Sequence, residues 1–316
     1  MMHKKQLIKP KAIFLMGPTA SGKTKLAIML KKKLPLEIIS VDSGLVYKGM
    51  DIGTNKPSKK ELKIAPHFLV DVCNPKKNYS VADFYFDACA AMNSITKRGN
   101  IPLLVGGTMF YFKTLLNGLP KLPSSNFQLR NQIKKKYSNN LIYLHSKLSK
   151  IDPIASNRIH PNDIQRVLRA LEIFYLSGGK TLTSLTKKNN HSLPYDFYQF
   201  VIYPSDKEKL NKLISLRFKK MLDLGLEEEV KKFYIKKDMN KDLSSMRTLG
   251  YREMWSYLSG EISYDNMIIK AVNNTKKLAK KQMTWLRQWK NIYWLNHEKK
   301  SIALNQIQQI FFFNKN

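Results

Sequence analysis

The sequence predicts an α/β protein in which helices cover a parallel sheet and a helical region is inserted into the chain. Short apolar segments alternate with helical patterns over residues 1–120, which is typical of a strand–helix repeat. Strand patterns then vanish between about Pro120 and Asp196, and a further apolar segment follows. We therefore expect a core formed by residues 1–120 and 197–316 and an inserted helical subdomain at 121–196.

The expected strands are short apolar segments that end at polar residues or glycines. Gly106 and Gly107 end the fourth strand, and Thr108 opens the helix that follows. Ser80 and Asp83 form a capping box at the start of an earlier helix. In chain order the expected strands are Lys11–Met16, Glu37–Val41, His67–Val72, Ile101–Val105 and Tyr198–Tyr203.

Two later helices are expected from their apolar periodicity. Asn162 is expected to cap the first, which ends at Gly178-Gly179. Its apolar stripe comprises Ile164, Val167, Leu168, Leu171, Phe174 and Tyr175. The last long helix runs from about Tyr264 to Lys290, and its expected buried seam is Ile268, Val272, Thr275, Ala279, Met283 and Leu286. The residues after Leu295 carry no informative pattern.

The composition is strongly basic. Fifty-five Lys and Arg against 23 Asp and Glu give a formal net charge of +32. This positive charge favours a polyanionic partner such as a nucleic acid, because each neutralised phosphate releases a counterion and so strengthens binding. A genome biased toward Lys, Asn and Ile codons is the alternative explanation, so the charge alone leaves both open.

Cys73 and Cys89 lack the spacing of a metal or redox pair, which favours a reducing cytoplasm. No apolar stretch reaches the roughly 18 residues of a membrane span. We expect a soluble cytoplasmic protein with no membrane partner.

Residues 17–24 carry the most specific motif. They fit G-x-x-x-x-G-K-[ST] between an expected strand and an expected helix, where backbone N–H groups cradle a di- or triphosphate. Lys23 would neutralise the phosphates and Thr24 would hold a phosphate-bound Mg²⁺. The expected phosphate-binding residues are Gly17, Pro18, Thr19, Ala20, Ser21, Gly22, Lys23 and Thr24.

Polar residues follow two further strands, and ligands of open α/β sheets lie beyond such strand ends. Asp42 is a candidate Mg²⁺ ligand or general base, or else a turn residue. Thr108 is a helix cap or a donor to substrate. The remaining candidates, His67, His145 and His160, lack metal or catalytic spacing and are expected to be structural.

Basic residues gather on two helices. Arg166 and Arg169 share one face of the inserted helix. In the last long helix one face carries Lys277, Lys281 and Trp285, and another carries Lys276, Lys280 and Arg287. Cations beside an aromatic side chain suit RNA phosphates and bases, although a solvated helix with a structural Trp has the same spacing.

Together with the phosphate motif, seven further segments resemble bacterial tRNA dimethylallyltransferases in order and spacing. They are Asp42–Tyr47, Met50–Pro57, Tyr79–Phe84, Gly106–Tyr111, Pro161–Glu172, Arg247–Arg252 and Leu278–Arg287. The phosphate motif alone occurs in many nucleotide-binding proteins, whereas the ordered set is specific and spans nearly the whole chain.

The resemblance implies a P-loop kinase-like core whose loop holds the diphosphate of dimethylallyl diphosphate. It implies that the prenyl group moves to the exocyclic N6 of the adenine at tRNA position 37, flipped into a channel, with release of pyrophosphate. In this family pattern Asp42 accepts the proton, while Lys23, Thr24-bound Mg²⁺ and Arg217, in Arg217–Leu222, stabilise the leaving group. The chemistry does not require ATP, and ATP binding to the loop is left open.

The resemblance also implies the tRNA contacts of a monomeric enzyme. Those expected at the target adenine are Asp42, Ser43, Gly44, Leu45 and Thr108. Those expected on the anticodon stem-loop are Arg130, Gln165, Arg166, Val167, Leu168, Arg169, Arg247, Thr248, Leu249, Gly250, Tyr251, Arg252, Lys280, Lys281, Gln282, Met283, Thr284, Trp285, Leu286 and Arg287.

The chain departs from the family pattern at five positions. Asn55 and Asn274 stand where Ala is usual, Phe68 where His is common, and Lys276 and Lys281 where Arg is usual. Lys keeps the charge of Arg but loses its bidentate phosphate geometry. Two other functions are considered: a small-molecule P-loop enzyme, either a nucleotide kinase or an adenylate prenyltransferase, and a catalytically silent RNA-binding protein.

Overall fold

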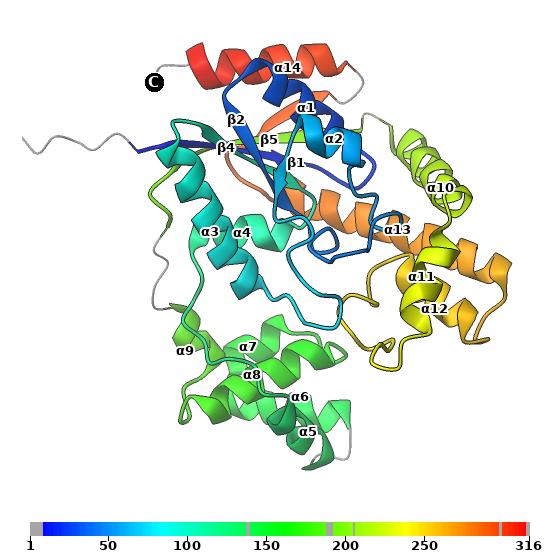
Figure 1. Ribbon diagram of the computed structural model, residues 1–316. Coiled ribbons are helices and arrows are strands. Elements are labelled where there is room, and N and C mark those ends of the chain that lie inside the picture. The colour runs from blue at the N-terminus through cyan, green and yellow to red at the C-terminus, as the bar shows by residue number, and fades with distance from the viewer. Residues whose placement is uncertain (1–8, 137–139, 188–191, 205, 297–298, 314–316) are drawn as a thin grey trace, which may run out of the picture. The chain divides into compact units, whose positions relative to one another are not determined.

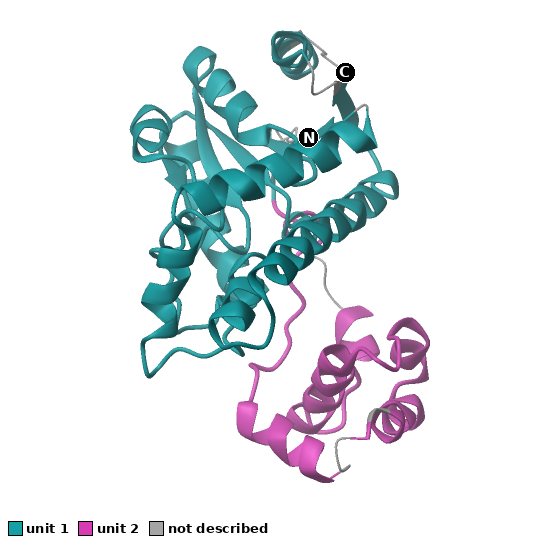
Figure 2. Ribbon diagram, turned by 90° about the vertical axis from the view of Figure 1, so that its right-hand side faces the viewer, with its two compact units in different colours: residues 1–114, 194–316 teal, residues 115–193 magenta. Residues whose placement is uncertain are grey.

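The computed structural model describes residues 9–136, 140–187, 192–204, 206–296 and 299–313. The contacts divide the chain into two compact units (Figure 2). Unit 1 comprises residues 1–114 and 194–316, and unit 2 comprises residues 115–193. The sequence analysis places the insert at 121–196.

Unit 1 is built on a six-stranded sheet whose neighbouring strands all run parallel, as the sequence predicts. The strand order is β3-β2-β4-β1-β5-β6. Parallel strands bring their carboxyl ends to one edge of the sheet, which is where a ligand site is expected. The strands are β1 Lys11–Met16, β2 Leu36–Val41, β3 His67–Phe68, β4 Ile101–Gly106, β5 Asp196–Tyr203 and β6 Tyr293–Asn296.

Helices cover both faces of this sheet (Figure 1). α1 and α14 pack on one face through Leu26, Leu30 and Leu304, and α3 packs on the other through its contacts with β2 and β4. The predicted capping box is confirmed, because Ser80 Oγ accepts from Asp83 N at 3.2 Å and Asp83 Oδ2 accepts from Ser80 N at 2.8 Å. The helices are α1 Lys23–Lys33, α2 Lys59–Ile64, α3 Val81–Lys97, α4 Met109–Asn117, α10 Lys207–Asp223, α11 Leu226–Tyr234, α12 Tyr251–Leu258, α13 Tyr264–Arg287 and α14 Lys300–Gln308.

The third predicted strand is too long. β3 contains only His67 and Phe68, whereas the sequence predicts a strand that continues to Val72. Leu69 and Asp71 have φ angles of 63° and 58°. Left-handed backbone cannot continue an extended strand, so the pairing with β2 ends after two residues.

The C-terminal segment contains structure that no sequence pattern predicts. β6 extends the sheet beside β5, and α14 follows it. Ala303, Leu304 and Ile307 are buried against the α1 side of the sheet. A π-helical turn at Gln309–Phe313 then buries Phe311 in the same cluster. This segment therefore completes the main hydrophobic core.

The described elements of unit 2 are helices around their own small core. The cap of α8 is Asp163, not Asn162 as predicted, since Asp163 Oδ1 accepts from Arg166 N at 3.2 Å. The predicted end of α8 at the two glycines is confirmed, because Ser177 is its C-cap, Gly178 has a φ of 64° and Gly179 N donates to the Phe174 carbonyl at 2.9 Å. The helices are α5 Phe127–Lys136, α6 Leu141–Ile151, α7 Pro153–Arg158, α8 Ile164–Leu176 and α9 Leu182–Lys187.

In the described part of the chain, no helix combines the length and the apolar character that crossing a membrane requires.

Candidate active site

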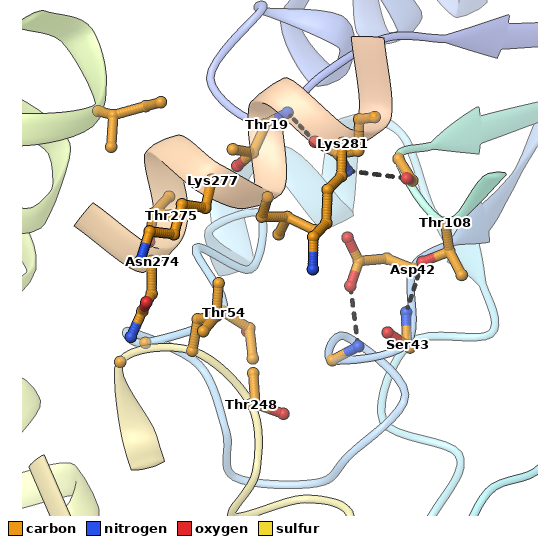
Figure 3. Close-up of a pocket in the computed structure, with 18 of the residues that line it drawn as sticks. Thr19, Asp42, Ser43, Thr54, Thr108, Thr248, Asn274, Thr275, Lys277 and Lys281 are labelled. Atoms are coloured by element: carbon orange, nitrogen blue, oxygen red, sulfur yellow. Dashed lines mark hydrogen bonds between the residues drawn. The ribbon is translucent and has the colours of Figure 1, made fainter. Parts of the chain in front are cut away.

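A pocket of about 660 Å³ in unit 1 lies at the carboxyl ends of the central strands (Figure 3). Thr19 follows β1, Asp42 follows β2 and Thr108 follows β4, and all three side chains line it. Residues of α10 and α13 form the opposite walls. The structure therefore brings together the three strand ends that the sequence analysis singles out.

The phosphate loop joins β1 to α1 as its motif predicts. A Cβ added at Gly17 would lie 2.4 Å from the carbonyl oxygen of Ile202, so only glycine fits beside β5. Gly22 has a φ of 86° and immediately precedes α1. Lys23 Nζ donates to the Pro18 carbonyl at 2.6 Å. The Lys23 ammonium is thus folded over its own loop, where a bound anion would meet it.

Two cations lie at this loop. Burial lowers the pKa of Lys23 to about 7, an effect that Asp42 opposes and Arg217 strengthens. Burial also lowers the pKa of Arg217, and Asp42 again opposes the shift. Arg217 reaches the loop from α10 and donates to the Thr19 hydroxyl. Such desolvated cations favour an anionic ligand, which fits a diphosphate.

Asp42 uses its two carboxylate oxygens differently. Oδ1 accepts from Gly44 N at 2.8 Å and from Leu45 N at 3.4 Å, which makes Asp42 a turn residue. Oδ2 has no hydrogen-bond partner among the residues that the structure describes. One oxygen is therefore anchored and the other is available to accept a proton.

Thr108 and Gly106 hold the neighbouring strand end close to Asp42. Thr108 Oγ1 accepts from Ser43 N at 3.2 Å, so its own hydroxyl proton can still be donated. A Cβ at Gly106 would lie 2.0 Å from the Val41 carbonyl oxygen. Gly106 is thus needed for the close approach of β4 to the end of β2, whereas a Cβ at Gly107 would lie 2.5 Å from Gln282 Nε2.

Gln282 on α13 connects two of the strand ends. Its Oε1 accepts from Thr19 N at 2.9 Å, and its Nε2 donates to the Gly107 carbonyl at 2.8 Å. The side chain is buried. Gln282, which is among the expected tRNA contacts, lines the pocket, and its amide group bonds these two loops. It aligns the phosphate loop with the β4–α4 connection.

The buried seam of α13 differs from the predicted one. Ala279 and Leu286 are buried as predicted, whereas Ile268, Val272, Thr275 and Met283 are only partly buried. The polar Gln282 occupies the seam because its hydrogen bonds compensate for burial. The buried residues of α13 are Met267, Ala271, Ala279, Gln282 and Leu286.

The two basic faces of α13 have different surroundings. Lys277, Lys281 and Trp285 line the pocket, as their shared face predicts. Lys281 points into the pocket on the side where Asp42 lies (Figure 3). Lys280 and Arg287 are exposed and do not line the pocket. Lys113 Nζ lies 5.5 Å from the centroid of the Trp285 ring.

The segment at 247–252 forms another wall. Thr248, Leu249, Gly250 and Arg252 line the pocket, while Tyr251 is fully buried behind them. Arg252 Nη2 lies 2.5 Å from Glu253 Oε1, which also accepts from Asn274 Nδ2 at 3.0 Å. Arg247 is exposed, with Nη2 3.5 Å from Asp242.

Several expected RNA contacts belong to unit 2, where a buried carboxylate organises them. Glu172 Oε2 lies 2.9 Å from Arg130 Nη2 and 2.5 Å from Arg169 Nη1. Burial raises the pKa of Glu172, but the hydrogen bonds from these arginines outweigh that effect and lower it. Val167 and Leu168 are buried in the core, while Gln165 and Arg166 are exposed.

Sequence reasoning missed three kinds of site residue. Phe110 and Thr54 line the pocket, and both lie inside segments already noted for their resemblance to the family. Asn274 lines it as well and was noted as a departure from the family pattern. The carboxylate Glu229 carries no local signal, because its partners lie in other elements.

The donors near the loop fit a loosely held Mg²⁺ better than an all-protein metal cage. No group of three or more His, Cys, Asp or Glu that could hold a metal occurs within the described residues. Thr24 lies in the first turn of α1, and its hydroxyl has no protein partner in the described part of the chain. Mg²⁺ is commonly held by one or two such oxygens together with substrate phosphates and water.

The chain is similar to known tRNA-modifying enzymes. The family model described as IPP transferase matches residues 45–289. The structure of the full-length tRNA isopentenylpyrophosphate transferase from Bacillus halodurans is 35% identical, has a TM-score of 0.71 and is matched over 96% of either chain. That of tRNA delta(2)-isopentenylpyrophosphate transferase from Staphylococcus epidermidis is 34% identical, with a TM-score of 0.68, over 96% of this chain and 99% of that chain.

A structure of a eukaryotic dimethylallyltransferase acting on tRNA is also similar. It is 28% identical, with a TM-score of 0.83, over 97% of this chain and 80% of that chain. The matched lengths therefore include both units of the present chain.

Proposed function

This chain belongs to the IPP transferase family, and we propose that it transfers the dimethylallyl group of dimethylallyl diphosphate to the exocyclic N6 of the adenine at tRNA position 37. The similar solved structures are of enzymes named for tRNA prenyl transfer. The observation that carries the proposal is the shared pocket of Asp42, with one free carboxylate oxygen, and the cationic phosphate loop. A small-molecule P-loop enzyme is not favoured.

The donor would bind with its diphosphate on the loop of residues 17–24. Lys23 and Arg217 supply the positive charge, and the first turn of α1 supplies backbone N–H groups. We propose that Thr24 helps to hold Mg²⁺, which when bound neutralises charge on the departing pyrophosphate. The Thr19 hydroxyl, held by Arg217, would orient the phosphate oxygens.

The transfer step needs a base near the acceptor nitrogen. The adenine N6 forms a bond to C1 of the dimethylallyl group as the C1–O bond breaks, and the electron pair of that bond leaves with pyrophosphate. The N6 proton passes to Asp42 Oδ2, the oxygen that accepts no protein hydrogen bond among the described residues. Thr108 would donate its free hydroxyl proton in a hydrogen bond to the target adenine.

The RNA would meet the pocket at the basic face of α13. Lys277, Lys281 and Trp285 offer two cations and an aromatic ring at the pocket wall, which suits a flipped loop nucleotide. The net charge of +32 supports a polyanionic partner. The anticodon stem-loop as the bound region, a monomeric state and a cytoplasmic location stay predictions.

The decisive experiment incubates the protein with dimethylallyl diphosphate, Mg²⁺ and an anticodon stem-loop that carries adenine at position 37, and then measures the RNA mass. We expect a gain of one prenyl group that disappears when this adenine is replaced. Binding of the RNA without any mass gain would contradict the proposal and favour a silent RNA-binding protein. Activity on free AMP alone would favour the small-molecule enzyme.

A further inference from the structure

Glu229 on α11 is a buried carboxylate with four hydrogen-bond donors. It accepts from the backbone N–H groups of Asp51 at 2.9 Å, Ile52 at 2.8 Å and Gly53 at 3.0 Å. It also accepts from the Tyr251 hydroxyl at 2.5 Å. A buried carboxylate is costly unless it is fully hydrogen-bonded, and here the compensation comes from two separate segments.

Both segments lie at the pocket. Gly53 and Thr54 line it from one, and Gly250 and Arg252, which flank Tyr251, line it from the other. The two are in direct contact, because a Cβ at Gly53 would lie 2.4 Å from Tyr251 Cε2. Glu229 therefore ties together residues 51–53 and the start of α12, two neighbouring segments that form one wall of the pocket.

The same wall contacts the turn that holds Asp42. A Cβ at Gly44 would lie 3.2 Å from the Thr54 methyl and 3.5 Å from the Thr248 methyl. Gly44 N is the donor 2.8 Å from Asp42 Oδ1. Contacts thus run from Glu229 through Thr54 and Gly44 to the proposed base.

We propose that Glu229 is a positioning residue, which clamps these two segments so that the Gly44 turn aims the free oxygen of Asp42 at the acceptor nitrogen. The inference rests on the proposed function. The diphosphate side of the pocket is held by other contacts, those of Gln282 and Arg217 with Thr19. Loss of Glu229 should therefore slow the chemical step and leave donor binding unchanged.

The test compares Glu229→Ala and Glu229→Gln with the wild type in single-turnover prenylation. We expect Glu229→Ala to lower the rate about 100-fold, as a misplacement of about 1 Å can do. The Kd of dimethylallyl diphosphate should stay within about twofold, since its contacts are intact. The rate of Glu229→Gln should lie between those of Glu229→Ala and the wild type. Its amide oxygen still accepts hydrogen bonds from some of the backbone N–H groups, while its NH₂ group opposes the remaining donors.

Two controls separate positioning from simple loss of stability. Glu228→Gln changes an exposed neighbour outside the pocket and should leave the rate unchanged. Leu304→Ala removes buried contacts of α14 and should lower the melting temperature without changing the rate of the folded enzyme. Amide hydrogen exchange should rise at residues 42–54 in Glu229→Ala but not in Leu304→Ala.

The outcomes are distinct. An unchanged rate in both Glu229 variants would overturn the inference, as would an equal loss of rate in Leu304→Ala. A wild-type enzyme that modifies no RNA would overturn the proposed function, and unchanged exchange at residues 42–54 would then overturn the clamp as well.

Discussion

The Asp42 carboxylate stabilises a turn through one oxygen and keeps the other oxygen free. The sequence leaves open whether Asp42 is a turn residue or a functional carboxylate, and the structure makes the two roles compatible. The Gly44 and Leu45 amides fix the carboxylate through Oδ1. Asp42 lines the pocket, and its Oδ2 has no hydrogen-bond partner among the described residues. A rigidly held base needs little reorganisation when the proton moves.

We expect Asp42→Ala to lower the single-turnover rate by at least about 100-fold, which is the range for loss of a general base. RNA affinity should change little, because the other pocket walls are intact. Rapid-quench measurement of prenylated stem-loop, together with filter binding, tests both expectations. A near wild-type rate would show that Asp42 is not the base.

The lowered pKa of Lys23 predicts that anion binding depends on pH. Burial lowers its pKa to about 7 from an ordinary value of 10.5, so in the free protein it loses its charge as the pH rises through 7. The folded state binds fewer protons than the unfolded state between these values. The contribution of Lys23 to the free energy of unfolding is therefore least favourable below pH 7 and becomes more favourable as the pH rises toward 10.5.

A bound diphosphate needs the charged form of Lys23, so we expect pyrophosphate affinity to fall as the pH rises from about 6.5 to about 8.5. Titration calorimetry in the presence of Mg²⁺ measures this. Lys23→Arg, whose side chain stays charged, should show only the weaker pH dependence of pyrophosphate itself. The same pH profile in both proteins would contradict the shifted pKa of Lys23.

At the scale of elements, the lysines of α13 differ in their surroundings. Lys277 and Lys281 line the pocket beside Trp285, and Lys280 lies outside it. Gln282, one residue after Lys281, fixes this rotation of the helix by bonding two loops. This buried amide and the apolar seam of α13 therefore place Lys277 and Lys281 at the pocket.

We expect Lys277→Ala with Lys281→Ala to weaken stem-loop binding and to reduce the slope of log K against log salt by about 2. The matched pair Lys276→Ala with Lys280→Ala removes the same charge and should change the slope less. Fluorescence anisotropy over a salt series distinguishes them. Equal slopes for wild type and the pocket pair would identify these lysines as solvated.

In unit 2 the ion network of α8 is an element-scale feature. Glu172 is completely buried and is paired by Arg130 and Arg169. Because these bonds hold its pKa below 4.5, the stabilisation is complete above that pH and is lost as the pH falls below it. The buried Glu172 carboxylate thus fixes the side chains of Arg130 and Arg169.

Breaking this network should be costly, and we expect Glu172→Ala to destabilise unit 2 by about 3 kcal/mol, since two arginines would lose a buried partner. Arg166→Gln is the comparison, because its pair with Asp163 is largely exposed and worth about 0–1 kcal/mol. Urea unfolding of both variants measures the difference. Equal midpoints would mean that the Glu172 network is not stabilising.

At the scale of the whole molecule, the C-terminal segment is part of the main core. Leu295, Leu304, Ile307 and Phe311 join α1 and the sheet in one cluster. α1 starts at the phosphate loop, so the helix that supports the loop is itself covered by α14. Burial of this distant segment therefore stabilises the core of unit 1.

We expect Phe311→Ala to lower the free energy of unfolding by about 3 kcal/mol, as for other buried aromatic residues. Phe312→Ala is the matched control, because that ring is 41% exposed. Thermal unfolding with and without pyrophosphate measures both. A loss confined to Phe312→Ala would contradict the burial of Phe311.

The sequence by itself determines the features that depend on local spacing. Strand–helix alternation predicts the parallel sheet, and residues 17–24 predict the phosphate loop at its first turn. Asp42 and Thr108 follow from the same logic, because parallel strands end at one edge. The positions of these residues in the fold are confirmed, because each prediction of position needs only the pattern of neighbouring residues.

Only the tertiary structure decides how buried polar groups are satisfied. Gln282 bonds Thr19 across 263 positions of the chain, and Glu229 bonds Ile52 across 177. Nothing near either residue in the sequence indicates these partners, and hydrophobic periodicity treats both as surface residues. The pairing of distant polar groups sets the rotation of α13 and the wall beside Asp42, because a buried donor or acceptor must find its partner wherever the fold places it.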